Sequence, residues 1–157
     1  MNIINKQPVD TIGFHFIEDK YLPRGKNEYH LRDKQQRRVI SYRALNASEI
    51  EILIANRNTA DDWKNIQVTE GFNPNLVKQN TFFGLVRIGR LRSEFHEFHN
   101  FKMPVGIYNS TIISSDIGDD VCIDNVKYLS HYIIESDVML ANRSEEHTSE
   151  LQSRQYL

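Results

Sequence analysis

The sequence has little of what marks several common protein classes. Its 157 residues include one cysteine, Cys122, so no disulfide can form within the chain, and a reducing, cytoplasmic setting is expected. No apolar run exceeds four residues, as at Ile52 to Ala55, whereas a helix needs about 20 to cross a bilayer. Nineteen basic and 21 acidic side chains give a net charge of −2, without a broad cationic surface. We therefore expect neither nucleic acid nor a membrane as a partner.

Signals for export and for phosphate or cofactor binding are also missing. The N-terminus carries Lys6 among polar residues and lacks the apolar segment of a secretory signal. Gly25 and Lys26 lack the preceding glycine of a phosphate-binding loop, and no Gly-x-Gly-x-x-Gly occurs. The sequence consequently predicts no cofactor. An apolar fraction of 39% and a charged fraction of 25% are typical of one globular domain.

Residues 1–38 predict an irregular N-terminal arm. Glycine, proline and scattered aromatic residues occur there without a helical period, so at most one short strand is expected, near Ile12 to Ile17. The arm ends in a charged run, Lys34 to Arg38, which indicates a solvated face or a contact with the phosphates of a nucleotide substrate.

Residues 39–74 predict a helical lead-in. Asn46 to Glu49 offers capping side chains before an i, i+3, i+4 apolar stripe, which predicts a helix over about 47–57. A second helical turn is expected over 60–63, after Thr59. The apolar side chains of this lead-in should cover the end of the segment that follows; they are Ile50, Leu53, Ile54 and Trp63.

Beyond Pro74, mostly apolar residues recur every six positions. They are Leu76, Phe82, Ile88, and then Val105, Thr111, Ile117, Ile123 and Leu129. A period of six fits neither a helix nor an alternating strand, but it fits a solenoid in which three short strands and their corners form one triangular coil. The register slips by one position after Leu129, and Lys127 is polar where a small inward residue is expected. We therefore expect a bulge or short loop from Lys127 to Ile133.

This spacing resembles that of the left-handed parallel β-helix of the hexapeptide-repeat superfamily. The segment Ile117 to Ile123 is a close match to the repeat of that superfamily. Four further segments resemble the N-terminal part of an uncharacterised bacterial family of much longer proteins, domain of unknown function 4954; they are Tyr42 to Leu45, Thr59 to Trp63, Phe82 to Gly89 and Pro104 to Ser110. The resemblance implies an all-β fold. Residues 75–142 would form a truncated left-handed parallel β-helix, preceded by the short α-helical lead-in.

The resemblance also implies two functions of different classes. One is an acyl- or nucleotidyl-transferase that acts on a sugar or a nucleotide sugar, takes acyl-CoA as a donor, and works as a homotrimer with sites between subunits. The present segment alone would then be inactive. The other is a non-catalytic β-solenoid scaffold or binding module. The fold by itself does not choose between them.

His131 is the candidate catalytic residue. Hexapeptide-repeat acyltransferases generally use a histidine as general base, and an imidazole suits this role because its ordinary pKa lies near neutrality. The alternative is a partly buried histidine that is hydrogen-bonded to the backbone. His96 and His99 stand beside two carboxylates but supply only two ring ligands, so residues 94–99 predict no metal site. They predict a surface loop or an inserted strand that is packed by its phenylalanines.

The C-terminal residues 143–157 are interpreted as a non-native tail. Residues 143–153 read RSEEHTSELQS, which is similar to the translation of a common sequencing-library adapter. The alternative is a natural polar helix that starts near Ser144, where two glutamates follow the serine.

Overall fold

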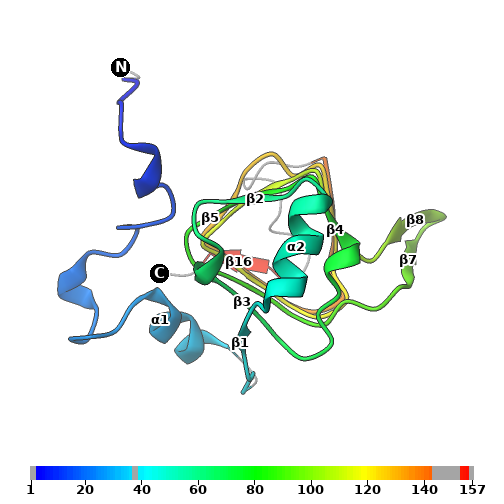
Figure 1. Cartoon of the computed structure of the whole chain (residues 1–157), viewed down its shortest axis with the longest axis horizontal. Coiled ribbons are helices and arrows are strands. Elements are labelled where there is room, and N and C mark those ends of the chain that lie inside the picture. Colours follow the sequence, from blue (N-terminus) through cyan, green and yellow to red (C-terminus); the bar gives the residue numbers. More distant parts are fainter. Residues whose placement is uncertain (1–2, 37–38, 143–152, 156–157) are drawn as a thin grey trace.

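The chain is mostly β, with few helices and with parallel sheets (Figure 1). The structure is a computed structural model that describes residues 3–36, 39–142 and 153–155. No helix within these residues is both long and apolar enough to pass through a membrane.

Three sheets and one hairpin contain the strands. Sheet A has the order β1 (Arg43–Ala44), β3 (Ile66–Val68), β6 (Val86–Ile88), β11 (Asp116–Ile117), β14 (Tyr132–Ile134) and β16 (Ser153–Gln155). Sheet B contains β2 (Thr59–Ala60), β5 (Thr81–Phe83), β10 (Thr111–Ile113) and β13 (Leu129–Ser130). Sheet C contains β4 (Val77–Lys78), β9 (Gly106–Tyr108), β12 (Cys122–Asp124) and β15 (Met139–Ala141). Strands β7 (Phe95–Phe98) and β8 (Phe101–Pro104) form the hairpin.

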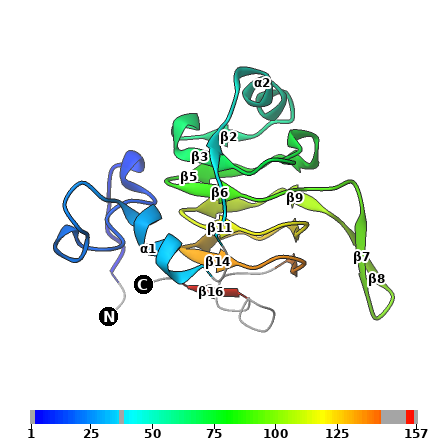
Figure 2. The ribbon, with the colours of Figure 1, turned by 90° about the horizontal axis from the view of Figure 1, so that it is seen from below.

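From β10 to β15 the chain takes one strand from each sheet in turn, in the order B, A, C. Partner strands in successive layers run parallel, as β10 with β13, β11 with β14 and β12 with β15. Paired residues lie 17 positions apart in the sequence, as Asp116 and Ile133 do. Figure 2 shows these layers stacked, with α2 (Ala47–Ala55) at one end.

Aliphatic and aromatic side chains line up in columns behind the three sheets and share one core. The columns are Val68, Ile88, Ile117 and Ile134 in sheet A; Ala60, Phe82, Ile112 and Leu129 in sheet B; and Val77, Ile107, Ile123 and Leu140 in sheet C. All are buried except Ala60, which packs against the core while partly exposed. This shared core holds the sheets together through apolar burial.

The six-residue prediction is right for most of these positions and wrong for Thr111 and Leu76. Each is only partly buried and directly precedes the residue that enters a column, Ile112 or Val77. The reason is that the steps between core residues of neighbouring sheets are unequal: Phe82 to Ile88 takes six residues, whereas Val77 to Phe82 and Ile112 to Ile117 take five. The same short step recurs one layer later, so the expected bulge from Lys127 to Ile133 is absent, and β13 and β14 continue the parallel pairing.

The lead-in helix α2 forms as predicted and ends two residues earlier than expected. Asn46 accepts a hydrogen bond from the Glu49 amide, and the Glu49 carboxylate accepts one from the Asn46 amide, which completes a capping box. Leu53 is buried in the core, whereas Ile54, expected to pack there, is 55% exposed. The helical turn expected over 60–63 is also wrong, because Ala60 lies in β2 and a 3₁₀ turn, η3 (Trp63–Asn65), begins later.

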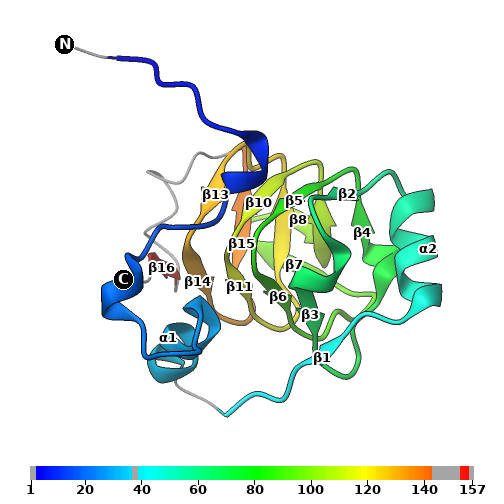
Figure 3. The same cartoon turned by 60° about the vertical axis from the view of Figure 1, so that its left-hand side comes forward.

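The N-terminal arm contains a helix that the sequence did not predict, α1 (Glu28–Gln35), besides the 3₁₀ turns η1 (Val9–Thr11) and η2 (Asp19–Tyr21). The strand expected near Ile12 to Ile17 does not form; this segment consists of turns and bends. The arm lies along the outside of the layers, with α1 beside sheet A (Figure 3). A last 3₁₀ turn, η4 (Pro74–Leu76), precedes β4.

The expected tail, residues 143–157, lies outside the described residues except for β16, which pairs antiparallel with β14.

Candidate functional site

The outer face of sheet A carries a charged column under α1. Gln67, Arg87 and Asp116 are register neighbours on the adjacent strands β3, β6 and β11. Because alternate residues of a strand point to opposite faces, the core residues beside Arg87 and Asp116 direct these two charged residues outward. Helix α1, which begins after the Asn27 cap, covers them, so both charged groups are buried.

Asp116 is the centre of this network. Its carboxylate accepts two hydrogen bonds from Arg87, from Nε to Oδ1 at 2.8 Å and from Nη2 to Oδ2 at 2.7 Å. Arg32 of α1 donates to Oδ1 at 2.7 Å, and the Gln36 amide donates to Oδ2 at 2.9 Å. Burial alone would raise the pKa of Asp116, but the hydrogen bonds and charges of the two arginines hold it below its ordinary value. The carboxylate therefore stays ionised and fixes both guanidinium groups.

Two tyrosines stack against the same guanidinium groups. The Arg87 guanidinium lies 4.4 Å from the Tyr42 ring centre and 4.8 Å from that of Tyr29, and Arg32 lies 4.9 Å from Tyr29. The Tyr29 hydroxyl donates to the carbonyl oxygen of Asn65. Burial raises the pKa of Tyr29 to about 12 and also raises that of Tyr42, so both phenols remain neutral. They can donate hydrogen bonds but do not serve as bases at neutral pH.

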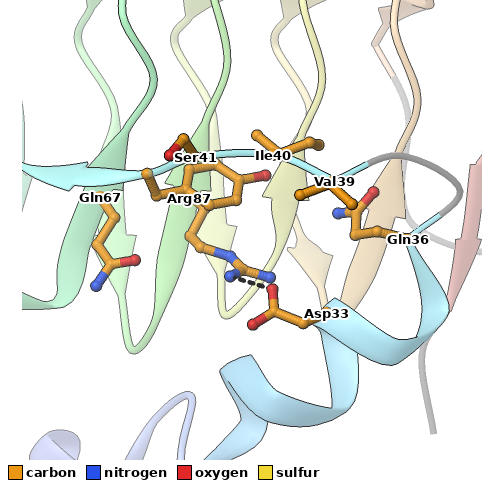
Figure 4. Close-up of a pocket in the computed structure, with 8 residues that line it drawn as sticks. Asp33, Gln36, Val39, Ile40, Ser41, Gln67 and Arg87 are labelled. Atoms are coloured by element: carbon orange, nitrogen blue, oxygen red, sulfur yellow. Dashed lines mark hydrogen bonds and ion pairs between the residues drawn. The ribbon is translucent and has the colours of Figure 1, made fainter.

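A cavity of about 560 Å³ opens beside this network, between α1, the 39–42 segment and sheet A (Figure 4). Its lining includes Asp33, Gln36, Ser41, Tyr42, Gln67 and Arg87. Asp33 accepts a hydrogen bond from Arg87 Nη1 at 2.7 Å, which places a third carboxylate–guanidinium contact at the cavity wall. The volume is in the range of small-ligand sites. Of these lining residues Arg87 is buried, whereas Asp33 and Ser41 are exposed.

His131, the predicted general base, lies at a corner of the layers and not in this cavity. Gly84, Ser114 and His131 have φ of 71°, 41° and 64°, and backbone hydrogen bonds join this corner from layer to layer. The arm covers it: Ser114 Oγ donates to the Gly13 carbonyl at 2.5 Å, and Phe16 stacks on the imidazole at 3.9 Å between ring centres. The ring is 8% exposed, and its Nδ1 lies 2.5 Å from Ser130 Oγ. Catalysis by His131 would require the arm to move.

Burial lowers the pKa of His131 to about 4, with a smaller contribution from Arg32. We expect the ring-proton resonances of His131 to stay constant from neutral pH to about pH 5 and to shift near pH 4 in an NMR titration. Since the folded pKa is below the unfolded one, the stability that neutral His131 contributes is lost as the pH falls from 6.5 toward 4.

The Phe16→Ala variant is the control for this titration, because it uncovers the ring. Its His131 pKa should rise toward the ordinary value of 6.5. A midpoint near 6.5 already in the unaltered protein would show that the arm does not cover the ring in solution.

The histidines of the hairpin do not come together as a metal site. His96 Nε2 lies 2.6 Å from the Asp120 carbonyl oxygen, while His99 is exposed at the turn between β7 and β8. No group of three or more histidine, cysteine or acidic side chains that could hold a metal ion occurs among the described residues. Cys122 is fully buried under the hairpin, its Sγ 3.4 Å from the Met103 carbonyl oxygen, and burial raises the pKa of its thiol to about 11.

Sequence reasoning missed the Arg32, Arg87 and Asp116 network. The local signal for Arg87 is its place between two core residues, Val86 and Ile88, where a strand points one charge away from the core. No local signal connects it with Arg32. Of the charged run at the end of the arm, Lys34 is exposed, whereas residues 37–38 lie outside the described residues.

Comparisons with known proteins found a family model and a relative that match the chain. A profile of the family described as a domain of unknown function (DUF4954) matches residues 42–150. An uncharacterized protein of Treponema pallidum (strain Nichols) is 39% identical over 136 residues, which are 86% of this chain and 19% of that protein. The chain thus spans about a fifth of the length of this relative. No solved structure matches.

Proposed function

We propose, since the chain belongs to the DUF4954 family, that it is part of a hexapeptide-repeat left-handed β-helix protein. In this proposal the whole protein is an acyl- or nucleotidyl-transferase that acts on a sugar or a nucleotide sugar, and it works as a homotrimer. Acyl-CoA is a donor that this class of enzyme uses.

One observation supports the β-helix proposal more than any other: strands 16 or 17 residues apart pair in parallel in each of three sheets. Over these later strands the chain returns to the same sheet at nearly constant intervals, with an aliphatic residue facing the core each time, which matches a stacked repeat. Parallel crossovers in other folds are right-handed, so general rules do not predict the left-handed sense of the proposed coil. That sense is carried over from the hexapeptide resemblance.

The cavity beside Arg87 supports the transferase proposal. It combines the size of a small-ligand site with carboxylate, amide, hydroxyl and guanidinium groups, which together can donate to and accept from sugar hydroxyls. His131 remains the proposed general base. In this role the N-terminal arm would move during turnover, so that Phe16 no longer stacks on the imidazole.

A second candidate, a non-catalytic scaffold or binding module, is favoured by the hairpin. Its three phenylalanines, Phe95, Phe98 and Phe101, are 59%, 62% and 54% exposed. Apolar side chains gathered on one projecting element are a feature of surfaces that bind other proteins.

Calorimetry of a full-length family member separates the two candidates. The transferase proposal expects heat of binding on titration with coenzyme A or with a uridine-diphosphate sugar, together with a trimeric mass in light scattering. Absence of heat with every such ligand would contradict it and support the scaffold.

A further inference from the structure

We propose that the cavity beside Arg87 binds an uncharged sugar ring and excludes phosphate groups. This inference rests on the proposed function, since it names the part of the substrate that the transferase would hold there. Its occupant would lie between the floor of sheet A, the end of α1 and the 39–42 segment (Figure 4).

Among the described residues around the cavity the charges cancel, which favours an uncharged occupant. Two guanidinium groups, Arg32 and Arg87, face two carboxylates, Asp33 and Asp116, through hydrogen bonds of 2.7 to 2.8 Å. Each arginine is therefore already paired, and the described wall of the cavity has no uncompensated positive charge for a phosphate. A neutral ligand enters without breaking an ion pair, whereas a phosphate would compete with Asp33 or Asp116 for Arg87.

Polar groups that are still free to bind a ligand also line the cavity. Within the described part of the chain, the Gln67 amide and the Ser41 hydroxyl make no hydrogen bond. Asp33 uses one of its two carboxylate oxygens for Arg87. An amide and a hydroxyl can each donate and accept hydrogen bonds, and a carboxylate accepts them. Neighbouring hydroxyls of a sugar require this mixture of donors and acceptors.

Two apolar residues also line the cavity. Val39 and Ile40 lie on the segment that crosses above Gln67 and Arg87 (Figure 4). A pyranose ring has hydroxyls around its rim and an apolar face of C–H groups, so one side can bond to the polar floor while the other packs on these aliphatic side chains. Small-molecule sites combine apolar walls with a few placed polar groups in this way.

The test is an NMR titration of the whole 157-residue chain, labelled with nitrogen-15, with methyl glycosides of glucose, galactose and mannose. We expect at least one glycoside to shift the side-chain amide signals of Gln67 and Gln36 in a saturable manner. Uridine diphosphate, which carries phosphate and no hexose, should leave these signals in place. Because this readout uses the unaltered protein, it does not depend on the folding of a variant.

A matched pair of variants locates the site. Gln67→Leu should weaken glycoside binding about tenfold, because it leaves the shape of the wall and removes the hydrogen bonds. Gln7→Leu makes the same chemical change on an exposed residue of the arm and should leave the affinity unchanged. Chemical-shift dispersion of the backbone amides checks that both variants fold.

Three results would overturn the proposal: no glycoside shifts Gln67, uridine diphosphate shifts it as strongly as a glycoside does, or Gln67→Leu binds as well as Gln7→Leu. Failure of the transferase proposal gives a different pattern, in which the full-length protein shows no heat with coenzyme A or nucleotide sugars while glycosides still shift Gln67.

Discussion

Replacement of Asp116 with asparagine is expected to lower the free energy of unfolding by about 3–5 kcal/mol. Asp116 compensates two arginines whose side chains are 0% and 3% exposed, Arg32 and Arg87. Asparagine keeps the size of the side chain but removes the charge, so both buried guanidinium groups lose the carboxylate that they share, and Arg87 keeps the more exposed Asp33. Removal of one partner from a buried ion pair is strongly destabilising, because it leaves the other charge buried and uncompensated. Replacement of a whole pair by apolar residues often costs little.

Urea denaturation measures this loss, and limited trypsin digestion shows where it acts. The Arg32 bond is one of the contacts that hold α1 on sheet A, so cleavage within the arm should accelerate in Asp116→Asn before the layered sheets are cut. Asp124→Asn, an exposed change on β12, is the control and should alter stability little. Equal stability of the two variants would contradict the network described above.

Phe82→Ala should destabilise the protein by a similar amount, about 3–5 kcal/mol. Phe82 is 1% exposed and belongs to the core column of sheet B, where its register partners are Ala60 and Ile112. Truncation leaves a cavity at the centre of this column. Neighbouring layers cannot collapse into it without losing the register of their backbone hydrogen bonds.

Phe95→Ala is the matched control for this prediction. Phe95 is 59% exposed on the hairpin, so loss of its ring should change the unfolding free energy by less than about 1 kcal/mol. Denaturant midpoints for the two variants give the comparison. If both variants lose the same unfolding free energy, Phe82 does not occupy a close-packed core.

The core positions of the parallel strands were predictable from sequence because the spacing of apolar residues is a local signal. Ile117, Ile123 and Leu129 were expected to face the core, and all three are buried in the columns. The error at Thr111 came from the assumption of equal steps between sheets: Ile107 to Ile112 and Ile112 to Ile117 each take five residues, which a constant period of six cannot represent. The apparent slip after Leu129 comes from another five-residue step, from Leu129 to Ile134.

The charged site was not predictable, because its contacts join distant parts of the chain. Arg32 and Asp116 are 84 residues apart, and helix α1 buries an arginine and a glutamate instead of an apolar stripe. Apolar periodicity is the main sequence signal for a helix, so this helix gave none. Its one local signal was Asn27, whose side chain caps the first turn.

The hairpin shows a third limit of sequence reasoning. Strands were among the expectations for residues 94–99, and β7 forms there, but its phenylalanines were expected to pack and are exposed. Pairing of Phe98 with Phe101 is set by the turn between them, whereas their environment depends on what else lies beside the hairpin.

Nuclear Overhauser effects between backbone protons test the layered arrangement most directly. The structure predicts cross-peaks between strands for the parallel partners Ile112 and Leu129, Ile117 and Ile134, and Ile123 and Leu140, one pair from each sheet. All three should appear in the same sample with the pattern of parallel pairing. Antiparallel patterns, or the contacts between residues three and four positions apart that a helix over 112–123 would give, would contradict the fold and the site built on its outer face.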